Sequence, residues 1–113
     1  MIISKNEFLY THIFYGLLEL KTDFDAPTIF YFSEEDFAII LDRIEHYGCG
    51  IYGIETYINN EYCDTEVFET NGGKPCDPAW YRGAFESFRN YRSGLEYSAT
   101  YHVPEELLEK RSQ

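Results

Sequence analysis

The chain has 113 residues, of which 44% are hydrophobic and 26% are charged, a composition typical of one soluble globular domain spanning residues 1–113. Twenty acidic residues against nine basic ones give a formal charge of −11, which disfavours binding to nucleic acid or to anionic lipid surfaces. No apolar run reaches the roughly 18 residues of a membrane span, and the stretch MIISKNEFLY lacks signal-peptide features, so we expect a cytoplasmic protein without membrane contact.

The first element expected along the chain is an amphipathic helix from Glu7 to Leu20. Its apolar residues recur every three or four positions, the period of a helix with one buried face. They are Leu9, Tyr10, Ile13, Phe14, Leu17 and Leu18. Lys21–Pro27 is predicted to be a loop. Thr28–Phe32 is a short apolar run that fits either a strand or the lead into the next helix.

A second helix is predicted to begin after Ser33. The Ser-Glu-Glu-Asp stretch places a capping hydroxyl before three acids, which suit the positive end of a helix, and Gly48 provides the stop. Four apolar residues mark the buried face of this helix: Phe37, Ile40, Leu41 and Ile44.

A β-hairpin is predicted next. Residues 50–58 and 62–70 are rich in β-branched and aromatic residues, and Asn59-Asn60 between them can form a two-residue turn. In that register Ile58 pairs with Glu61. Each residue further back along the first strand then pairs with one equally further along the second, without a bulge. The hairpin then has one core face and one outer face, because side chains alternate along a strand.

The predicted register assigns each hairpin residue to a face. The core face holds Tyr52, Ile54, Thr56, Ile58, Cys63, Thr65 and Val67. The outer face holds Ile51, Gly53, Glu55, Tyr57, Tyr62, Asp64, Glu66 and Phe68. Glu55 is then opposite Asp64, a like-charge pair that disfavours the sheet by some tenths of a kcal/mol.

The last third of the chain contains a third helix, a strand and a short terminal helix. Residues 71–75 form a loop, after which Asp77-Pro78 supplies a cap and a proline in the first turn. The buried stripe of this helix is predicted to be Trp80, Tyr81, Ala84, Phe85, Phe88 and Tyr91. Residues 95–103 are predicted to be a strand. Pro104-Glu105-Glu106 begins the terminal helix, whose buried side carries Leu107 and Leu108.

These elements predict an α+β fold. We expect a single domain in which an antiparallel sheet containing a central hairpin packs against two main helices, with part of its other face free.

Enzymatic signatures are mostly absent from the sequence, and we expect neither catalysis nor a cofactor. The three cysteines, at positions 49, 63 and 76, have no metal-ligand spacing and are interpreted as small buried hydrophobes. A cysteine nucleophile needs a depressed pKa, which acidic surroundings oppose. Adjacent strand acids such as Asp64 and Glu66 are more often solvated than metal-binding.

The negative charge is concentrated in the middle of the chain. Residues 22–81 hold 13 acids and two bases, a difference equal to the whole net charge, and residues 50–70 hold five acids and no base. A half-solvated strand explains part of this pattern. Interleaved carboxylates and tyrosines also suit docking of a basic partner. The predicted contacts are Glu55, Tyr57, Tyr62, Asp64 and Glu66.

Three stretches carry a resemblance to a known family: FSEEDFAIILDRIEHYGCGIYGIETY, DPAWYRGAFESFR and YSATYHVPEELL. Across roughly residues 30–108, their order and residue types resemble the small acidic immunity proteins of bacterial polymorphic-toxin and contact-dependent growth-inhibition systems. The resemblance implies a cytoplasmic protein that binds the C-terminal domain of one cognate toxin, often a nuclease, in a one-to-one heterodimer. Such a protein blocks the active or substrate-binding surface of its toxin.

Two other functions fit the same residues. A phage-encoded nucleic-acid mimic that inhibits a defence nuclease has the same charge pattern but a partner encoded elsewhere. A small metal-dependent hydrolase requires bound metal or a pocket lined by Asp64, Glu66 and His46.

Overall fold

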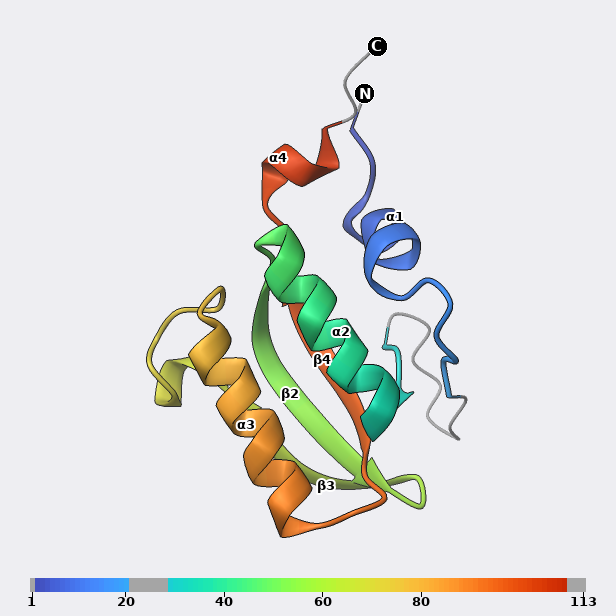
Figure 1. The fold of residues 1–113 in the computed structure, drawn as a ribbon, viewed down its shortest axis with the longest axis vertical. Helices are drawn as coiled ribbons and strands as arrows, with labels where there is room; N and C mark the ends of the chain where they lie inside the picture. Colours follow the sequence, from blue (N-terminus) through green and yellow to red (C-terminus); the bar gives the residue numbers. More distant parts are fainter. Residues whose placement is uncertain (1, 21–28, 110–113) are drawn as a thin grey trace.

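A computed structural model describes residues 2–20 and 29–109 and confirms the α+β fold class. Its antiparallel four-stranded sheet has the order β1-β4-β2-β3, so β3 lies at one edge (Figure 1). The elements are α1 (Lys5–Phe8), the π-helix η1 (Leu9–Ile13), β1 (Phe32–Ser33), α2 (Glu34–Tyr47), β2 (Gly50–Ile58), β3 (Glu61–Val67), the 3-10 helix η2 (Phe68–Thr70), α3 (Pro78–Tyr91), β4 (Glu96–His102) and α4 (Glu105–Leu108).

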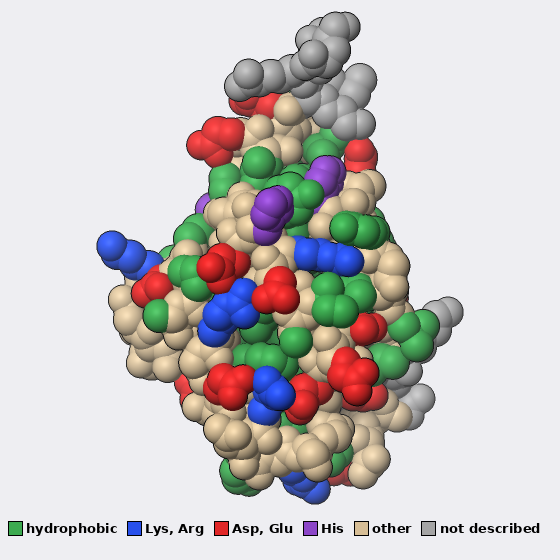
Figure 2. Space-filling model, in the orientation of Figure 1, with side chains coloured by type: hydrophobic (Ala, Val, Ile, Leu, Met, Phe, Trp, Pro, Cys, Tyr) green, Lys and Arg blue, Asp and Glu red, His purple; other side chains and the backbone are tan. Residues whose placement is uncertain are grey.

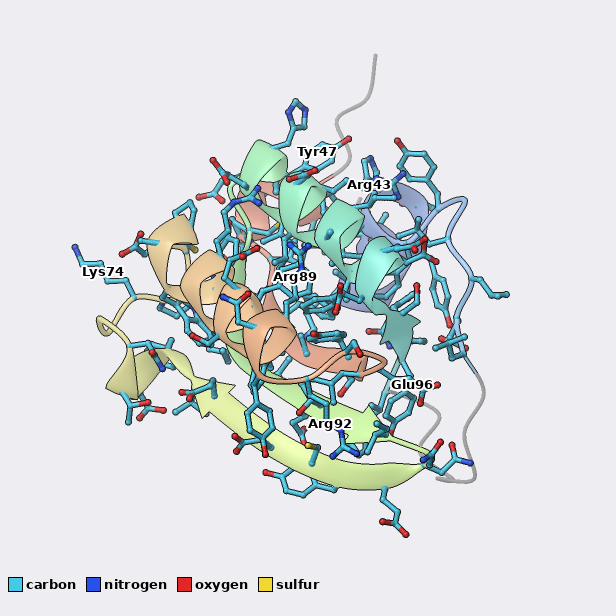
Figure 3. All side chains as sticks on the ribbon, turned by 60° about the horizontal axis from the view of Figure 1, so that its bottom comes forward. Arg43, Tyr47, Lys74, Arg89, Arg92 and Glu96 are labelled. Carbon is cyan, nitrogen blue, oxygen red and sulfur yellow. The ribbon has the colours of Figure 1, made fainter. Side chains whose placement is uncertain are left out.

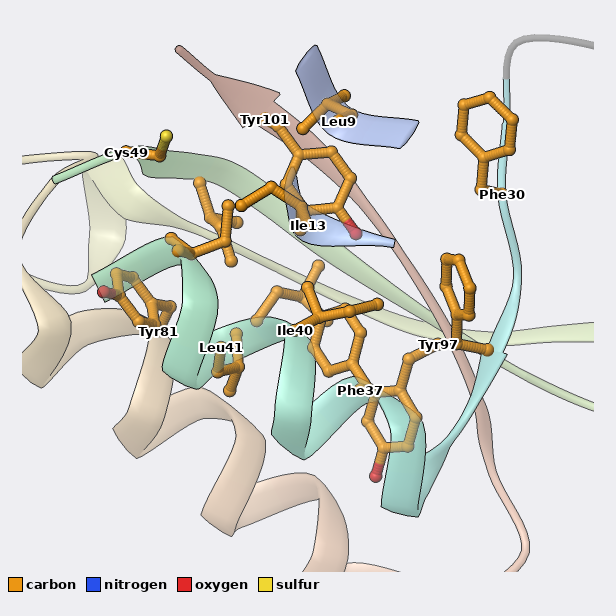
Figure 4. Close-up of a cluster of buried hydrophobic side chains, with 14 of the residues drawn as sticks. Leu9, Ile13, Phe30, Phe37, Ile40, Leu41, Cys49, Tyr81, Tyr97 and Tyr101 are labelled. Carbon is orange, nitrogen blue, oxygen red and sulfur yellow. The ribbon is translucent and has the colours of Figure 1, made fainter. Parts of the chain in front are cut away.

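The core lies between the sheet and the pair formed by α2 and α3, which run side by side over the same sheet face (Figure 1). Figure 4 shows how aromatic and aliphatic side chains from α2, α3, η1 and β4 meet there. Phe37 stacks on Tyr97 with ring centroids 5.1 Å apart and contacts Phe85 at 5.6 Å. No helix among the described residues is long and apolar enough to cross a membrane.

Helix α2 matches its prediction from the sequence. The Ser33 hydroxyl accepts the Asp36 N–H at 3.2 Å, and Gly48 ends the helix in a left-handed conformation with φ of 71°. The four expected core residues, Phe37, Ile40, Leu41 and Ile44, are completely buried. Capping and apolar period therefore determined this helix locally.

Helix α3 also begins as predicted, because Asp77 accepts the Ala79 N–H at 3.0 Å and Pro78 follows in the first turn. Five of its six expected core residues are buried. The prediction for Tyr91 was wrong, since its side chain is 75% exposed. Tyr91 is the last residue of α3, one turn past the last buried side chain, and the apolar period continues beyond the part of the helix that packs on the sheet.

The N-terminal helix is shorter than the sequence indicates. Its helical residues end at Ile13, Gly16 has a left-handed φ of 75°, and Tyr10 and Leu18 are exposed. Leu20 instead forms a bridge with Tyr31. The strand expected as one alternative at 28–32 is reduced to that bridge and β1. The predicted loop at 21–27 and Thr28 lie outside the described residues.

The C-terminal elements are close to their predictions. Strand β4 is one residue shorter at each end than expected, and α4 follows Pro104. Leu107 and Leu108 are half-buried and pack against the core. The Leu108 carbonyl accepts the Ile3 N–H at 2.7 Å, which joins the two ends of the described chain.

The hairpin turn is confirmed, but the register beyond it was wrong. Asn59 and Asn60 have φ of 51° and 65°, and Ile58 pairs with Glu61 as predicted. A β-bulge follows, in which Tyr57 pairs with Tyr62 but Thr56 pairs with Asp64, so Cys63 is the extra residue. The buried Thr56 hydroxyl donates to the Asp64 carbonyl and accepts from its N–H, both at 3.1 Å.

A second irregularity changes the faces of β2. The pairing with β4 shifts between Ile51 and Gly53, so that Ile51 and Ile54 are both fully buried although they are three positions apart. The expected faces of Ile51 and Tyr52 are therefore reversed, and Tyr52 is 38% exposed. Strand β3 does not pair with Ile51. The Ile51 N–H instead donates to the Pro75 carbonyl at 3.0 Å, and the Ile51 carbonyl accepts from the Trp80 indole N–H at 2.9 Å.

The close approach of the 75–76 loop to Gly50 leads to a prediction about stability. A Cβ on Gly50 would lie 2.8 Å from the carbonyl atoms of Pro75 and 2.9 Å from Cys76 Sγ. We expect Gly50→Ala to lower the free energy of unfolding by about 1–3 kcal/mol in urea denaturation, because the loop must move. The control is Gly83→Ala in α3, where a Cβ has nothing within 4 Å and helix propensity adds up to about 1 kcal/mol. Equal effects of the two variants would contradict this account.

A second prediction concerns Tyr101, whose buried hydroxyl has no hydrogen-bond partner among the described residues. Burial raises its pKa above the ordinary value, and burial raises the pKa of Tyr81 to about 12. Above pH 10 the unfolded chain therefore loses these protons first, and stability falls as pH rises. We expect Tyr101→Phe to stabilise the fold by about 1 kcal/mol at pH 7 and to reduce this alkaline loss, measured by thermal melting from pH 7 to 11. Tyr91→Phe, at an exposed position, is expected to change neither quantity.

Candidate partner-binding surface

The bulge at Cys63 divides the five predicted contact residues between the faces of the sheet. Cross-strand partners share a face, so Glu55 and Thr65, like Tyr57 and Tyr62, lie on the face opposite α2 and α3, here called the open face. Asp64 pairs with the buried Thr56, and Glu66 pairs with the buried Ile54, so both acids lie on the helix-covered side. The structure therefore brings Glu55, Tyr57 and Tyr62 together on the open face, and places Asp64 and Glu66 on its reverse.

Tyr57 packs beneath the surface of the open face, since only 7% of the residue is exposed. Its ring centroid lies 5.1 Å from that of Tyr31 and 5.9 Å from that of Tyr62, and its hydroxyl donates to Glu55 Oε2 at 3.2 Å. Burial, followed by the nearby Glu55 carboxylate, raises the Tyr57 pKa well above its ordinary value. Tyr62 is 55% exposed and available for contact.

Asp64 and Glu66 lie on the edge strand β3 and interact with backbone and amide groups there. Asp64 Oδ1 accepts the Thr65 N–H at 2.8 Å. The Asn71 amide donates to Glu66 Oε2 at 3.0 Å and to the Val67 carbonyl at 2.8 Å. Together with the bulge, these bonds occupy backbone groups and disfavour pairing of β3 with a further strand. Asp64 and Glu66 therefore help to protect the edge strand β3 from pairing with a strand of another molecule.

Four acids of the two helices are paired with arginines. Arg82 of α3 contacts Asp42 at 2.9 Å and Glu45 at 2.7 Å, both on α2, and Arg89 contacts Glu34 at 3.4 Å and Glu86 at 2.7 Å. Figure 2 shows the resulting mixture of acidic and basic side chains over α2 and α3. Opposite charges thus compensate these four acids, whereas Glu35 and Asp36 at the start of α2 have no arginine partner among the described residues.

The hairpin acids have no such compensation. Within residues 2–20 and 29–109, none of the ion pairs includes a hairpin acid: Glu55, Glu61, Asp64, Glu66 or Glu69. Lys74, the nearest base along the chain, projects away from the sheet on the loop before α3 (Figure 3). The hairpin and the η2 turn that follows it therefore form one acidic region without ion pairs, although Glu35 and Asp36 on α2 and Glu96 on β4 are also absent from the ion pairs of the described residues.

A shallow groove of about 240 Å³ lies on the open face beside Glu55. Its lining residues come from β2, β3, η2 and β4: Tyr52, Gly53, Glu55, Thr65, Val67, Phe68, Glu69 and Thr100. The rings of Tyr52 and Phe68 meet at 5.9 Å, and the Tyr52 hydroxyl is 2.9 Å from His102 Nδ1. Our sequence reasoning identified only Glu55 of this set as a contact, because the ideal register assigned Tyr52, Thr65 and Val67 to the core.

A metal site needs a cluster of ligand side chains, and a cysteine nucleophile needs a depressed pKa. No group of three or more His, Cys, Asp or Glu side chains that could hold a metal ion occurs in the described part of the chain. Of the three cysteines expected to be buried, Cys49 is buried, Cys63 is half-buried and Cys76 is exposed, so the expectation was wrong for Cys76. Burial raises the pKa of Cys49 to about 12, with a further contribution from Cys76, whose own pKa partial burial also raises. A raised pKa leaves the thiol protonated near neutral pH and therefore weakly nucleophilic.

Comparison with known proteins gives no relatives for this fold and surface: no family model, no curated protein and no solved structure matches the chain.

Proposed function

We propose that this protein is a cytoplasmic immunity protein that binds and neutralises a cognate bacterial toxin domain with a cationic surface, a nuclease in the first instance. The observation that carries the proposal is the distribution of charge. Arginines pair with four of the six acids on α2 and α3, whereas none of the five hairpin acids has a cationic partner among the described residues. Solvation and protection of the β3 edge account for part of this pattern, and a cationic partner accounts for the acids of the open face.

The negative charge of the hairpin acids attracts a cationic surface of the toxin. A nuclease needs Lys and Arg to hold phosphate groups, so an acidic surface of similar extent can occupy the same site. Long-range attraction accelerates the encounter and makes it dependent on salt, and burial of exposed rings such as Tyr62 and Tyr52 slows dissociation. Inhibition then requires only occlusion of the toxin's active or substrate-binding surface in a one-to-one heterodimer.

The test is binding to the product of the adjacent gene. The two proteins are co-expressed and co-purified, the mass of the complex is measured by light scattering, and growth is followed with the toxin expressed alone or with its partner. A one-to-one complex and restored growth support the proposal. Absence of both, with each protein folded, would refute it.

Inhibition of a nuclease encoded elsewhere in the host, with no binding to the adjacent product, would instead favour the nucleic-acid mimic, because both functions use the same acidic surface. Association rates measured at several salt concentrations add a second readout. A rate that does not change with salt would contradict the electrostatic mechanism.

A further inference from the structure

The groove on the open face indicates which chemical group of the partner it takes. Its volume of about 240 Å³ is below the range of about 300–1,000 Å³ that is usual for small-molecule sites. Two acidic residues, Glu55 on β2 and Glu69 on η2, line it together with Tyr52 and Phe68, whose ring centroids lie 5.9 Å apart. The site combines negative charge with aromatic surface in a space suited to part of one side chain.

The two acidic residues of the groove favour binding of a cationic group. Neither Glu55 nor Glu69 contacts a Lys or Arg in the described residues, and the hydrogen bond that Glu55 accepts comes from the neutral hydroxyl of Tyr57. Thr65 and Thr100 add hydroxyl groups to the lining. Carboxylate and hydroxyl oxygens are able to accept hydrogen bonds from a cation. The Tyr52 hydroxyl also contacts His102 Nδ1 at 2.9 Å, and the Thr65 hydroxyl contacts that of Tyr62 at 2.6 Å.

Arginine fits this lining better than lysine does. A guanidinium group is planar, stacks on aromatic rings and donates five N–H groups in fixed directions, whereas an ammonium group is a compact, strongly hydrated charge. The same chain already shows such an arrangement elsewhere. The Arg43 guanidinium carbon lies 3.8 Å above the Tyr15 ring, and its N–H groups donate to the carbonyls of Ile13 and Tyr15.

We infer that the groove formed by Tyr52, Glu55, Phe68 and Glu69 receives an arginine side chain of the toxin. This inference rests on the proposed function and deepens it, because it names the position and the chemical group at which the two proteins engage. Gly53 also lines the groove, and a Cβ there would make only ordinary contacts, with Val67 Cγ1 at 3.4 Å and the Glu66 carbonyl oxygen at 3.5 Å.

The test uses the whole protein and three capped tripeptides, Gly-Arg-Gly, Gly-Lys-Gly and Gly-citrulline-Gly. Each peptide is titrated up to its solubility limit into ¹⁵N-labelled protein, and backbone amide shifts are followed by NMR. We expect the arginine peptide to shift the amides of Gly53, Thr65 and Thr100, the lysine peptide to bind more weakly, and the uncharged citrulline peptide to cause no shift.

Variants test the two carboxylates separately. We expect Glu55→Gln and Glu69→Gln each to weaken binding of the arginine peptide by about threefold, the size typical of one exposed charge pair. Glu106→Gln, an equal charge change at an exposed site on α4, is the matched control and is expected to leave binding unchanged. Folding of all variants is checked by thermal melting.

The outcomes separate this inference from the proposed function. No shift with the arginine peptide, shifts located outside the groove, or equal binding of the three peptides would overturn the inference even if the adjacent toxin binds tightly. Arginine-specific shifts in the groove support it even if that toxin does not bind, in which case the proposed function alone fails.

Discussion

Replacing Glu55 and Asp64 together by lysine is expected to weaken binding to the cognate toxin by about 100-fold or more, because an attractive contact at Glu55 becomes repulsive and the hairpin loses four units of negative charge. Neither acid forms an ion pair in the described residues, so the fold should be retained. Calorimetry gives the affinity, stopped-flow fluorescence gives the association rate, and thermal melting reports folding.

The matched control is the double variant Glu105→Lys and Glu106→Lys. Both residues are exposed on α4, and their replacement changes the net charge by the same amount. A purely global effect of charge would lower the association rate equally in the two double variants. If affinity is unchanged when Glu55 and Asp64 are reversed, the hairpin is not the binding surface.

The single variants show which face of the hairpin meets the partner. Glu55 lies on the open face, whereas Asp64 lies on the reverse and holds the Thr65 N–H. We therefore expect Glu55→Lys to account for most of the lost affinity. A larger loss with Asp64→Lys would place the partner against the outer edge of β3 instead.

The second large effect is expected in the core. Phe37→Ala should lower the free energy of unfolding by about 3–5 kcal/mol, because a completely buried ring is replaced by a cavity. The Phe37 ring contacts Tyr97 and Phe85, so its loss affects α2, α3 and β4 together. Urea denaturation measures the change, since its midpoint falls while its slope is retained for a two-state fold.

Ile39→Ala is the control for this core substitution. Ile39 is on the same helix but is 39% exposed, and alanine favours helix, so the expected loss is below about 1 kcal/mol. Comparable losses in the two variants would show that α2 is stabilised by its own helical propensity rather than by packing on the sheet.

The sequence by itself determined the features that depend on neighbouring residues. Ser33 with its three acids and Gly48 fixed the ends of α2, Asp77-Pro78 fixed the start of α3, and Asn59-Asn60 fixed the turn. Caps and tight turns are made by residues within a few positions of each other, so local patterns are sufficient to predict them. The concentration of acids between residues 50 and 70 was likewise visible in the sequence.

Only the tertiary structure decided which face each hairpin residue occupies. The bulge at Cys63 accommodates the bonds between the buried Thr56 hydroxyl and the Asp64 backbone, and the shift between Ile51 and Gly53 turns Ile51 into the core. A bulge reverses every subsequent side chain, and its position depends on packing and bonds to distant elements. For that reason the sequence indicated an acidic hairpin, whereas the groove on its open face became visible only in the folded chain.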